Sequence, residues 1–80
     1  MKLPRDVSGR ELAKALEVLG YVVTRQAGSH MRLTTQQAGE HHLTIPAHNP
    51  LKIGTLNSVV REIASHFQMT REQAVERIWG

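Results

Sequence analysis

Apolar residues recur every three or four positions in the first quarter of the chain, which is the spacing of an amphipathic helix. Ser8 and Glu11 form the capping-box pattern of a helix start, and Gly20 is placed to end the helix in the left-handed conformation. The pattern therefore predicts a helix over about Gly9–Leu19. Its apolar stripe consists of Leu12, Ala15, Leu16 and Leu19.

Two further helices are predicted in the last third of the chain. The longer one is expected to open at Gly54 or Thr55. A second capping box, Thr70-Arg71-Glu72-Gln73, predicts a short terminal helix over about Arg71–Trp79. Trp79 is expected to pack on the domain, with contact to a protein partner as the alternative. The stripe of the longer helix consists of Leu56, Val59, Val60, Ile63 and Phe67.

Between the helices the pattern changes to that of strands. Tyr21–Gln26 is rich in β-branched and aromatic residues, whereas His30–Thr34 and His41–Ile45 alternate polar and apolar positions. Turns are expected at Ala27-Gly28-Ser29 and at Gln36–Glu40, and a loop at Pro46–Pro50. The alternation predicts a polar, outward face made of His30, Arg32, Thr34, His42 and Thr44.

This order of elements predicts an α+β fold in one domain over residues 1–80. A three-stranded antiparallel sheet would carry the helices on one face and leave the other face polar, with the terminal helix as an addition to an α-β-β-β-α core. The arrangement resembles the double-stranded-RNA-binding fold, although a fold alone does not define a function.

Composition excludes several classes of function. The chain has no cysteine and only three aromatic residues among 80, so no disulfide, thiolate metal site or small-molecule cofactor is expected. It has no apolar run of the roughly 20 residues that span a bilayer, and its first residues lack the apolar stretch of a secretory signal. The expectation is a cytoplasmic protein without a membrane partner.

The charge is concentrated in the middle of the chain. The net charge is +3, and residues 21–61 hold four basic residues against one acidic residue, together with four of the five histidines. Such a segment suits a polyanion such as nucleic acid. The alternative is an ordinary solvated basic surface.

Five short motifs, in this order, resemble the HicA toxin family. They extend over about residues 4–67 and are specific only in combination. They are Ser8–Leu12, Gly20-Tyr21 followed by a strand ending Arg25-Gln26, Gly28-Ser29-His30, Pro46-Ala47-His48, and Leu51–Leu56.

The resemblance implies a double-stranded-RNA-binding-like fold and a ribonuclease that cuts messenger RNA and arrests growth. It also implies that His30, the histidine of the Gly-Ser-His motif, is catalytic, and that a HicB antitoxin holds the protein inactive. Two departures from the family are visible. The stretch Val60–Thr70 is about one helical turn longer than usual, and Asn57 stands where members often carry a basic residue.

RNA carries its own nucleophile, so its cleavage needs little besides proton transfer and charge stabilisation. A histidine titrates near neutrality and therefore suits His30 to this task without a metal. Zinc is not expected, because no cysteine or carboxylate joins His30, His42 and His48. The candidate RNA-binding residues are Gly28, Ser29, Arg25, Arg32, His48, Lys52, Gly54 and Thr55.

Two other functions fit the same pattern. The chain would be a non-catalytic RNA-binding module if His30 were only a surface histidine after a turn. It would be a protein-interaction domain if the sheet face or the terminal helix bound a protein. The effect of salt distinguishes RNA binding from protein binding, because RNA binding weakens steeply as ionic strength rises.

Overall fold

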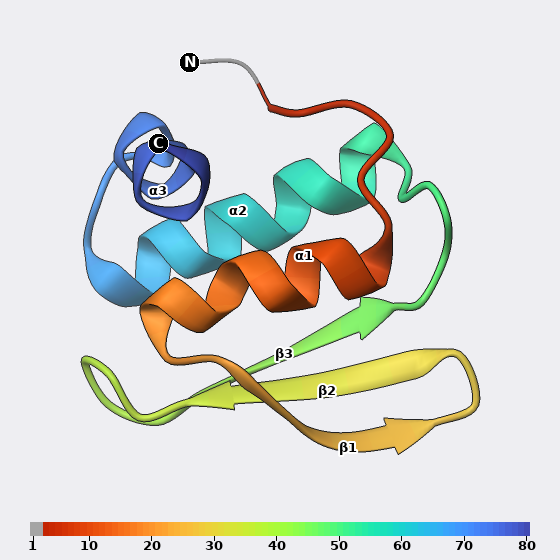
Figure 1. Cartoon of the computed structure of the whole chain (residues 1–80). Coiled ribbons are helices and arrows are strands. Elements are labelled where there is room, and N and C mark those ends of the chain that lie inside the picture. The colour runs from red at the N-terminus through yellow and green to blue at the C-terminus, as the bar shows by residue number, and fades with distance from the viewer. Residues whose placement is uncertain (1–2) are drawn as a thin grey trace.

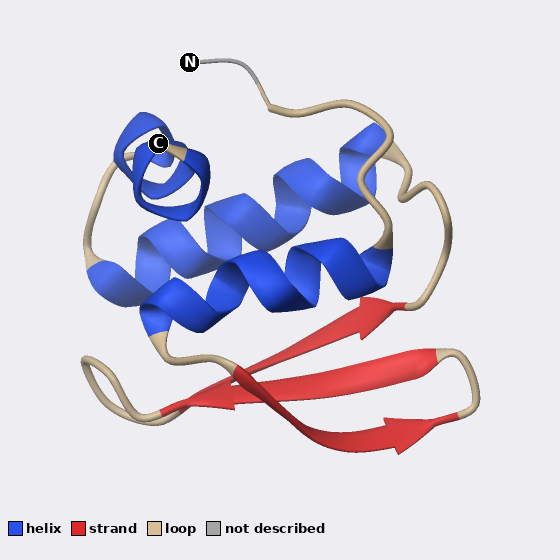
Figure 2. Cartoon of the chain, viewed as in Figure 1, coloured by secondary structure: helices blue, strands red, loops and turns tan. Residues whose placement is uncertain are grey.

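A three-stranded antiparallel sheet forms one layer of the protein, and helices cover only one of its faces (Figures 1 and 2). The computed structural model describes residues 3–80. The strands β1 (Val22–Ala27), β2 (His30–Thr35) and β3 (His41–Pro46) lie in the order β1-β2-β3. The helices are α1 (Gly9–Ala15), η1 (Leu16–Leu19), α2 (Ile53–Phe67) and α3 (Arg71–Trp79). This confirms the expected α+β, double-stranded-RNA-binding-like arrangement with an additional C-terminal helix.

Both predicted capping boxes are present. The Ser8 hydroxyl accepts from the backbone N–H of Glu11 at 3.0 Å, and the Glu11 carboxylate accepts from the N–H of Ser8 at 2.9 Å. Thr70 and Gln73 make the same reciprocal pair. Each box satisfies two amides that a helix start leaves without intrahelical partners. None of the helices in residues 3–80 has the length and apolarity that crossing a membrane requires.

Some element boundaries differ from the prediction. The last turn of the first helix is a 3₁₀ turn, and Gly20 ends it with φ 80°. The prediction that α2 opens at Gly54 or Thr55 was wrong. The helix begins at Ile53, because the N–H of Leu56 donates to the carbonyl of Lys52 at 3.0 Å and this bond closes the first turn earlier.

Tyr21 lies outside β1, although it was expected to begin that strand. Its N–H donates back to the carbonyl of Leu16 at 3.3 Å, and its side chain is fully buried. The strand then runs to Ala27 and contains an irregular register between Val23 and Arg25, typical of a β-bulge. The other two strands are each one residue longer than predicted, ending at Thr35 and Pro46.

The core lies between the sheet and the helices, as the stripes predicted. A smaller apolar cluster formed by Val60, Ala64, Ala74 and Val75 joins α2 to α3, and Trp79 packs against both clusters. The expected packing of Trp79 is therefore confirmed. The fully or almost fully buried residues of the main core include Leu12, Leu16, Leu19, Met31, Leu33, Leu43, Ile45, Leu56 and Ile63.

The opposite face of the sheet is bare of helices (Figure 2). His30, Arg32, His42 and Thr44 are exposed, as the alternation predicted. Thr34 belongs to the same face by register but is only 9% exposed. Its hydroxyl is in hydrogen-bond contact with the side chains of Thr24 and His42, and these neighbours cover it.

Candidate nucleic-acid interface

A tight turn positions His30 at one end of the bare sheet face. Gly28 has φ 59°, a left-handed conformation that glycine adopts without strain. Apart from its chain neighbours, no atom of residues 3–80 lies within 4 Å of where its Cβ would be. His30 begins β2 and pairs with Ala27 of β1 and Pro46 of β3. Its side chain is exposed, so a phosphate can approach the imidazole from solvent.

Three backbone hydrogen bonds hold the loop after β3 in place, one to this turn and two to the residues at the start of α1. The N–H of Ala47 donates to the carbonyl of Ser29 at 2.6 Å, and the N–H of Gly9 donates to the carbonyl of His48 at 2.9 Å. The N–H of Leu51 donates to the carbonyl of Val7 at 2.7 Å. The Gly-Ser-His and Pro-Ala-His motifs, far apart in sequence, are therefore joined through their backbones, and His48 is exposed near them.

Two arginines face each other next to His30. Arg25 of β1 pairs with Arg32 of β2, and Arg32 pairs in turn with Thr44 of β3. Both arginines are exposed, and within residues 3–80 neither makes an ion pair. Like charges directly across a strand pair are destabilising, and a bound anion relieves the repulsion. Arg32 follows His30 by two residues on the same face, a step of about 7 Å.

The start of α2 provides a separate group of candidates. Lys52 is the N-cap residue and makes no side-chain cap, and the first turn contains no acidic residue. The amides of this turn and the helix dipole favour an anion. Gly54 and Thr55 line a hollow of about 380 Å³ together with Thr44 of the sheet. The fold thus groups Gly28, Ser29, His30, Arg25 and Arg32 on one hairpin. Gly54 and Thr55 adjoin β3, and Lys52 directly precedes their helix.

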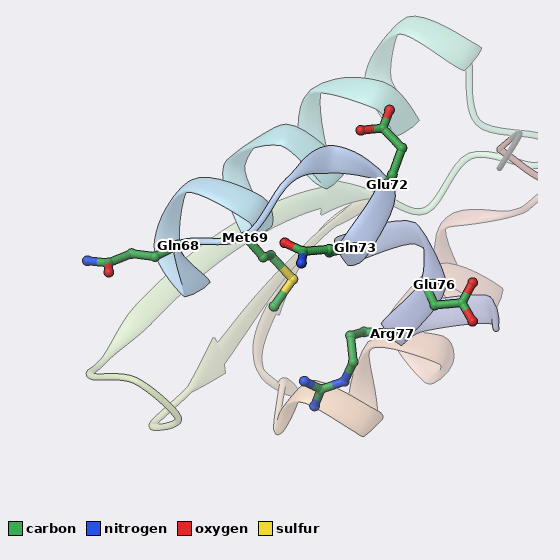
Figure 3. A pocket seen from close by; sticks show the side chains of 6 residues that line it. All are labelled: Gln68, Met69, Glu72, Gln73, Glu76 and Arg77. Atoms are coloured by element: carbon green, nitrogen blue, oxygen red, sulfur yellow. The ribbon is translucent and has the colours of Figure 1, made fainter.

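Another hollow lies away from the bare face of the sheet. Figure 3 shows it between the end of α2 and α3, with a volume of about 530 Å³. Its charged side chains are Glu72, Glu76 and Arg77, so acidic groups predominate. Such a lining repels phosphate, and the candidate interface is therefore on the sheet and not in this hollow.

A partly buried polar cluster at the other end of the sheet was not predicted from the sequence. The Tyr21 hydroxyl is hydrogen-bonded to Nδ1 of His41 at 2.7 Å, and Nε2 of His41 lies 3.5 Å from the carboxylate of Glu62. The His41 ring also stacks on His66 with centroids 4.4 Å apart. The sequence contains only a weak signal for it, since the alternation that points His42 outward points His41 inward.

Burial shifts the pKa values of two groups in this cluster, His41 and Tyr21. Burial is the main cause that lowers the pKa of His41, and the neighbouring His66 lowers it further, against the opposing effect of Glu62. Burial, with a smaller contribution from Glu62, raises the pKa of Tyr21 to about 12. His41 is therefore neutral in the fold near neutral pH, and the Tyr21 hydroxyl remains a donor.

The free energy of unfolding is expected to decrease as the pH falls below about 6.5, the ordinary pKa of histidine. The unfolded chain takes up a proton on His41 before the folded protein does, so acid favours unfolding. The stabilisation is complete above pH 6.5 and is lost as the pH falls through the lowered folded-state pKa. Urea unfolding at pH 7.5 and 5.0 measures it, and a His41→Gln variant should lose less stability between the two. Equal losses in both proteins would contradict this assignment.

The fold and the interface together define a small α+β protein with a basic, histidine-bearing sheet face. A family model described as HicA toxin of bacterial toxin–antitoxin matches residues 9–64, which is more than half of the chain. The chain belongs to this family and is the toxin of a toxin–antitoxin system. The comparison with curated proteins gave no match, and neither did the comparison with solved structures.

Both departures from the family lie where α3 attaches. The match ends at residue 64, before the stretch that leads into α3. Asn57 accepts a hydrogen bond from Nε of Arg71 at 2.7 Å and so links α2 to α3. Asn57 therefore serves the contact between α2 and α3 in this chain.

Proposed function

We propose that this toxin is a metal-independent endoribonuclease that cleaves messenger RNA, with His30 as its catalytic residue. The observation that carries the proposal is the position of His30. It is exposed at the end of a bare sheet face, one step from two arginines that have no acidic partner in residues 3–80. The proposed unit is one HicA-like domain over residues 1–80, acting in the cytoplasm.

Cleavage then proceeds as an internal transfer. The 2′-oxygen of the RNA loses its proton and attacks the adjacent phosphorus, while the bond from phosphorus to the 5′-oxygen breaks and that oxygen gains a proton. His30 carries out the essential proton transfer, since an imidazole acts as acid or base near neutral pH. Arg25 and Arg32, one two-residue step along the same face, bind the adjacent phosphate and so hold the strand in place. The products are a 2′,3′-cyclic phosphate and a 5′-hydroxyl.

The remaining candidates hold the substrate. Gly28 gives the RNA backbone close access to the turn, and Ser29 donates to a phosphate beside the cut. His48 lies on the loop fastened to Ser29 and binds the next phosphate. Lys52, Gly54 and Thr55 bind a more distant phosphate at the start of α2. The protein partner of the toxin is a HicB-type antitoxin.

The proposal is tested by incubating the purified protein with a long single-stranded RNA in EDTA. We expect cleavage, and we expect the upstream fragments to end in a 2′,3′-cyclic phosphate or a 3′-phosphate. Mass spectrometry of the fragments identifies these ends. Fragments with 3′-hydroxyl ends, a strict requirement for metal, or RNA binding without cleavage would each refute the mechanism.

A further inference from the structure

The bare sheet face continues beyond the two arginines. Two residues after Arg32, Thr34 pairs with Val22 of β1 and with His42 of β3. The His42 imidazole is held at both nitrogens: Nε2 donates to the Glu40 carboxylate at 2.8 Å, and Nδ1 is hydrogen-bonded to the Thr34 hydroxyl at 2.8 Å. This fixed hydrogen-bond chain forms the far end of the face.

A hollow of about 450 Å³ opens at this end of the sheet. Val22, Thr24 and Thr34 line it, with Gln36 and Gln37 of the following turn. Val22 is an apolar side chain left 57% exposed at its rim. An apolar wall with hydroxyl and amide groups around it matches a nucleobase, which has flat apolar faces and polar edges.

The spacing of the side chains connects the hollow to His30. His30, Arg32 and Thr34 alternate along β2 on the same face, and each step of two residues advances about 7 Å. This is close to the separation of successive phosphates in an extended RNA strand. A strand with its scissile phosphate at His30 therefore places the next phosphate between Arg25 and Arg32, and the following nucleotide at the hollow.

The charges around the hollow determine which part of that nucleotide fits into it. Glu40 stands beside His42 at this end and disfavours a phosphate there, whereas the arginines one step away favour one. The base is therefore the group that fits. A paired base is stacked inside a duplex and does not reach the hollow, so the substrate strand is single-stranded.

We propose that the hollow between Val22 and Thr34 is a nucleobase site for single-stranded RNA, two nucleotides from the bond that His30 cuts. The position of the cut rests on the proposed function, whereas the base site itself is a matter of binding. Val22 contacts the face of the base, and the side chain of Gln37 meets its edge, while Thr34 lies beneath at the wall of the hollow. His42 is a positioning residue that holds the Thr34 hydroxyl in place.

The test uses binding without cleavage. A His30→Ala protein is titrated against fluorescent six-nucleotide RNAs in which one abasic residue replaces each position in turn. We expect one position at which loss of the base weakens binding about tenfold, a typical effect for one base contact. In a His30→Ala protein that also carries Val22→Ser, unmodified RNA should bind about tenfold more weakly. The abasic residue should then cause no further loss of RNA affinity.

Val18→Ser is the matched control, because Val18 is a similarly exposed valine (52%) on η1, away from the hollow. It should bind every RNA like the His30→Ala protein. If the abasic residue weakens RNA binding by the same factor with and without Val22→Ser, the base site is overturned and the proposed ribonuclease stands. If Val22→Ser weakens only antitoxin binding, the hollow is a protein contact and the base site is again overturned. If neither the His30→Ala protein nor the wild type binds any RNA, both proposals are overturned.

Discussion

A His30→Ala variant is expected to cleave RNA about a thousandfold more slowly than the wild type, or slower still. Proton transfer by a positioned side chain contributes roughly 10²–10⁴-fold to a rate, and no second histidine shares the turn that presents His30. Its stability should not change, because His30 is exposed and its side chain makes no hydrogen bond within residues 3–80. Timed gel assays and urea unfolding measure the two quantities.

Gln26→Ala provides the matched control for this experiment. Gln26 is exposed on the same hairpin but pairs with Met31, so its side chain belongs to the other face of the sheet. We expect it to cleave RNA at the wild-type rate. Equal activity in the wild type and in a folded His30→Ala variant would remove His30 from the mechanism. A loss of activity that accompanies unfolding of the variant would mean that His30 has a structural role.

The architecture was predictable because its signals are local. Reciprocal capping at Ser8 and Thr70, alternation along β2 and the left-handed glycine at Gly20 each depend on a few neighbouring residues, and the structure contains all of them. The start of α2 was placed too late because Lys52 begins the helix through its carbonyl alone, without the polar side chain that marks most helix starts.

The features that escaped prediction depend on contacts between distant residues. Tyr21 resembles a strand residue in sequence, yet its side chain is fully buried in the core and is hydrogen-bonded to His41, twenty positions later. The bulge near Thr24 brings the Thr24 side chain into contact with Thr34. The alternation of polar and apolar residues does not predict such an insertion. The same limit applies to the nucleic-acid interface, since the pairing of Arg25 with Arg32 is a matter of strand register.

Gly9 is the clearest case of a residue that the folded chain requires to be small. It begins α1, and a Cβ there would overlap the carbonyl oxygen of Pro46 and lie 3.0 Å from the Cα of Ala47. Neither group is free to move. Pro46 is paired with His30 in the sheet, and the N–H of Ala47 is bonded to Ser29. A Gly9→Ala variant is therefore expected to lose about 3 kcal/mol of unfolding free energy, at the upper end for an overpacked site.

Gly54→Ala is the control that separates this clash from the ordinary effect of replacing a helical glycine. Gly54 also lies in the first turn of a helix, but in the described part of the chain nothing beyond its own helical neighbours lies within 4 Å of the position of its Cβ. Alanine should leave stability unchanged there or raise it by up to about 1 kcal/mol. Urea unfolding of both variants makes the comparison, and equal midpoints would contradict the clash. If Gly9→Ala is destabilised as expected, its folded fraction should also cleave RNA more slowly, because the displaced loop is the one that fastens His48 beside the turn of His30.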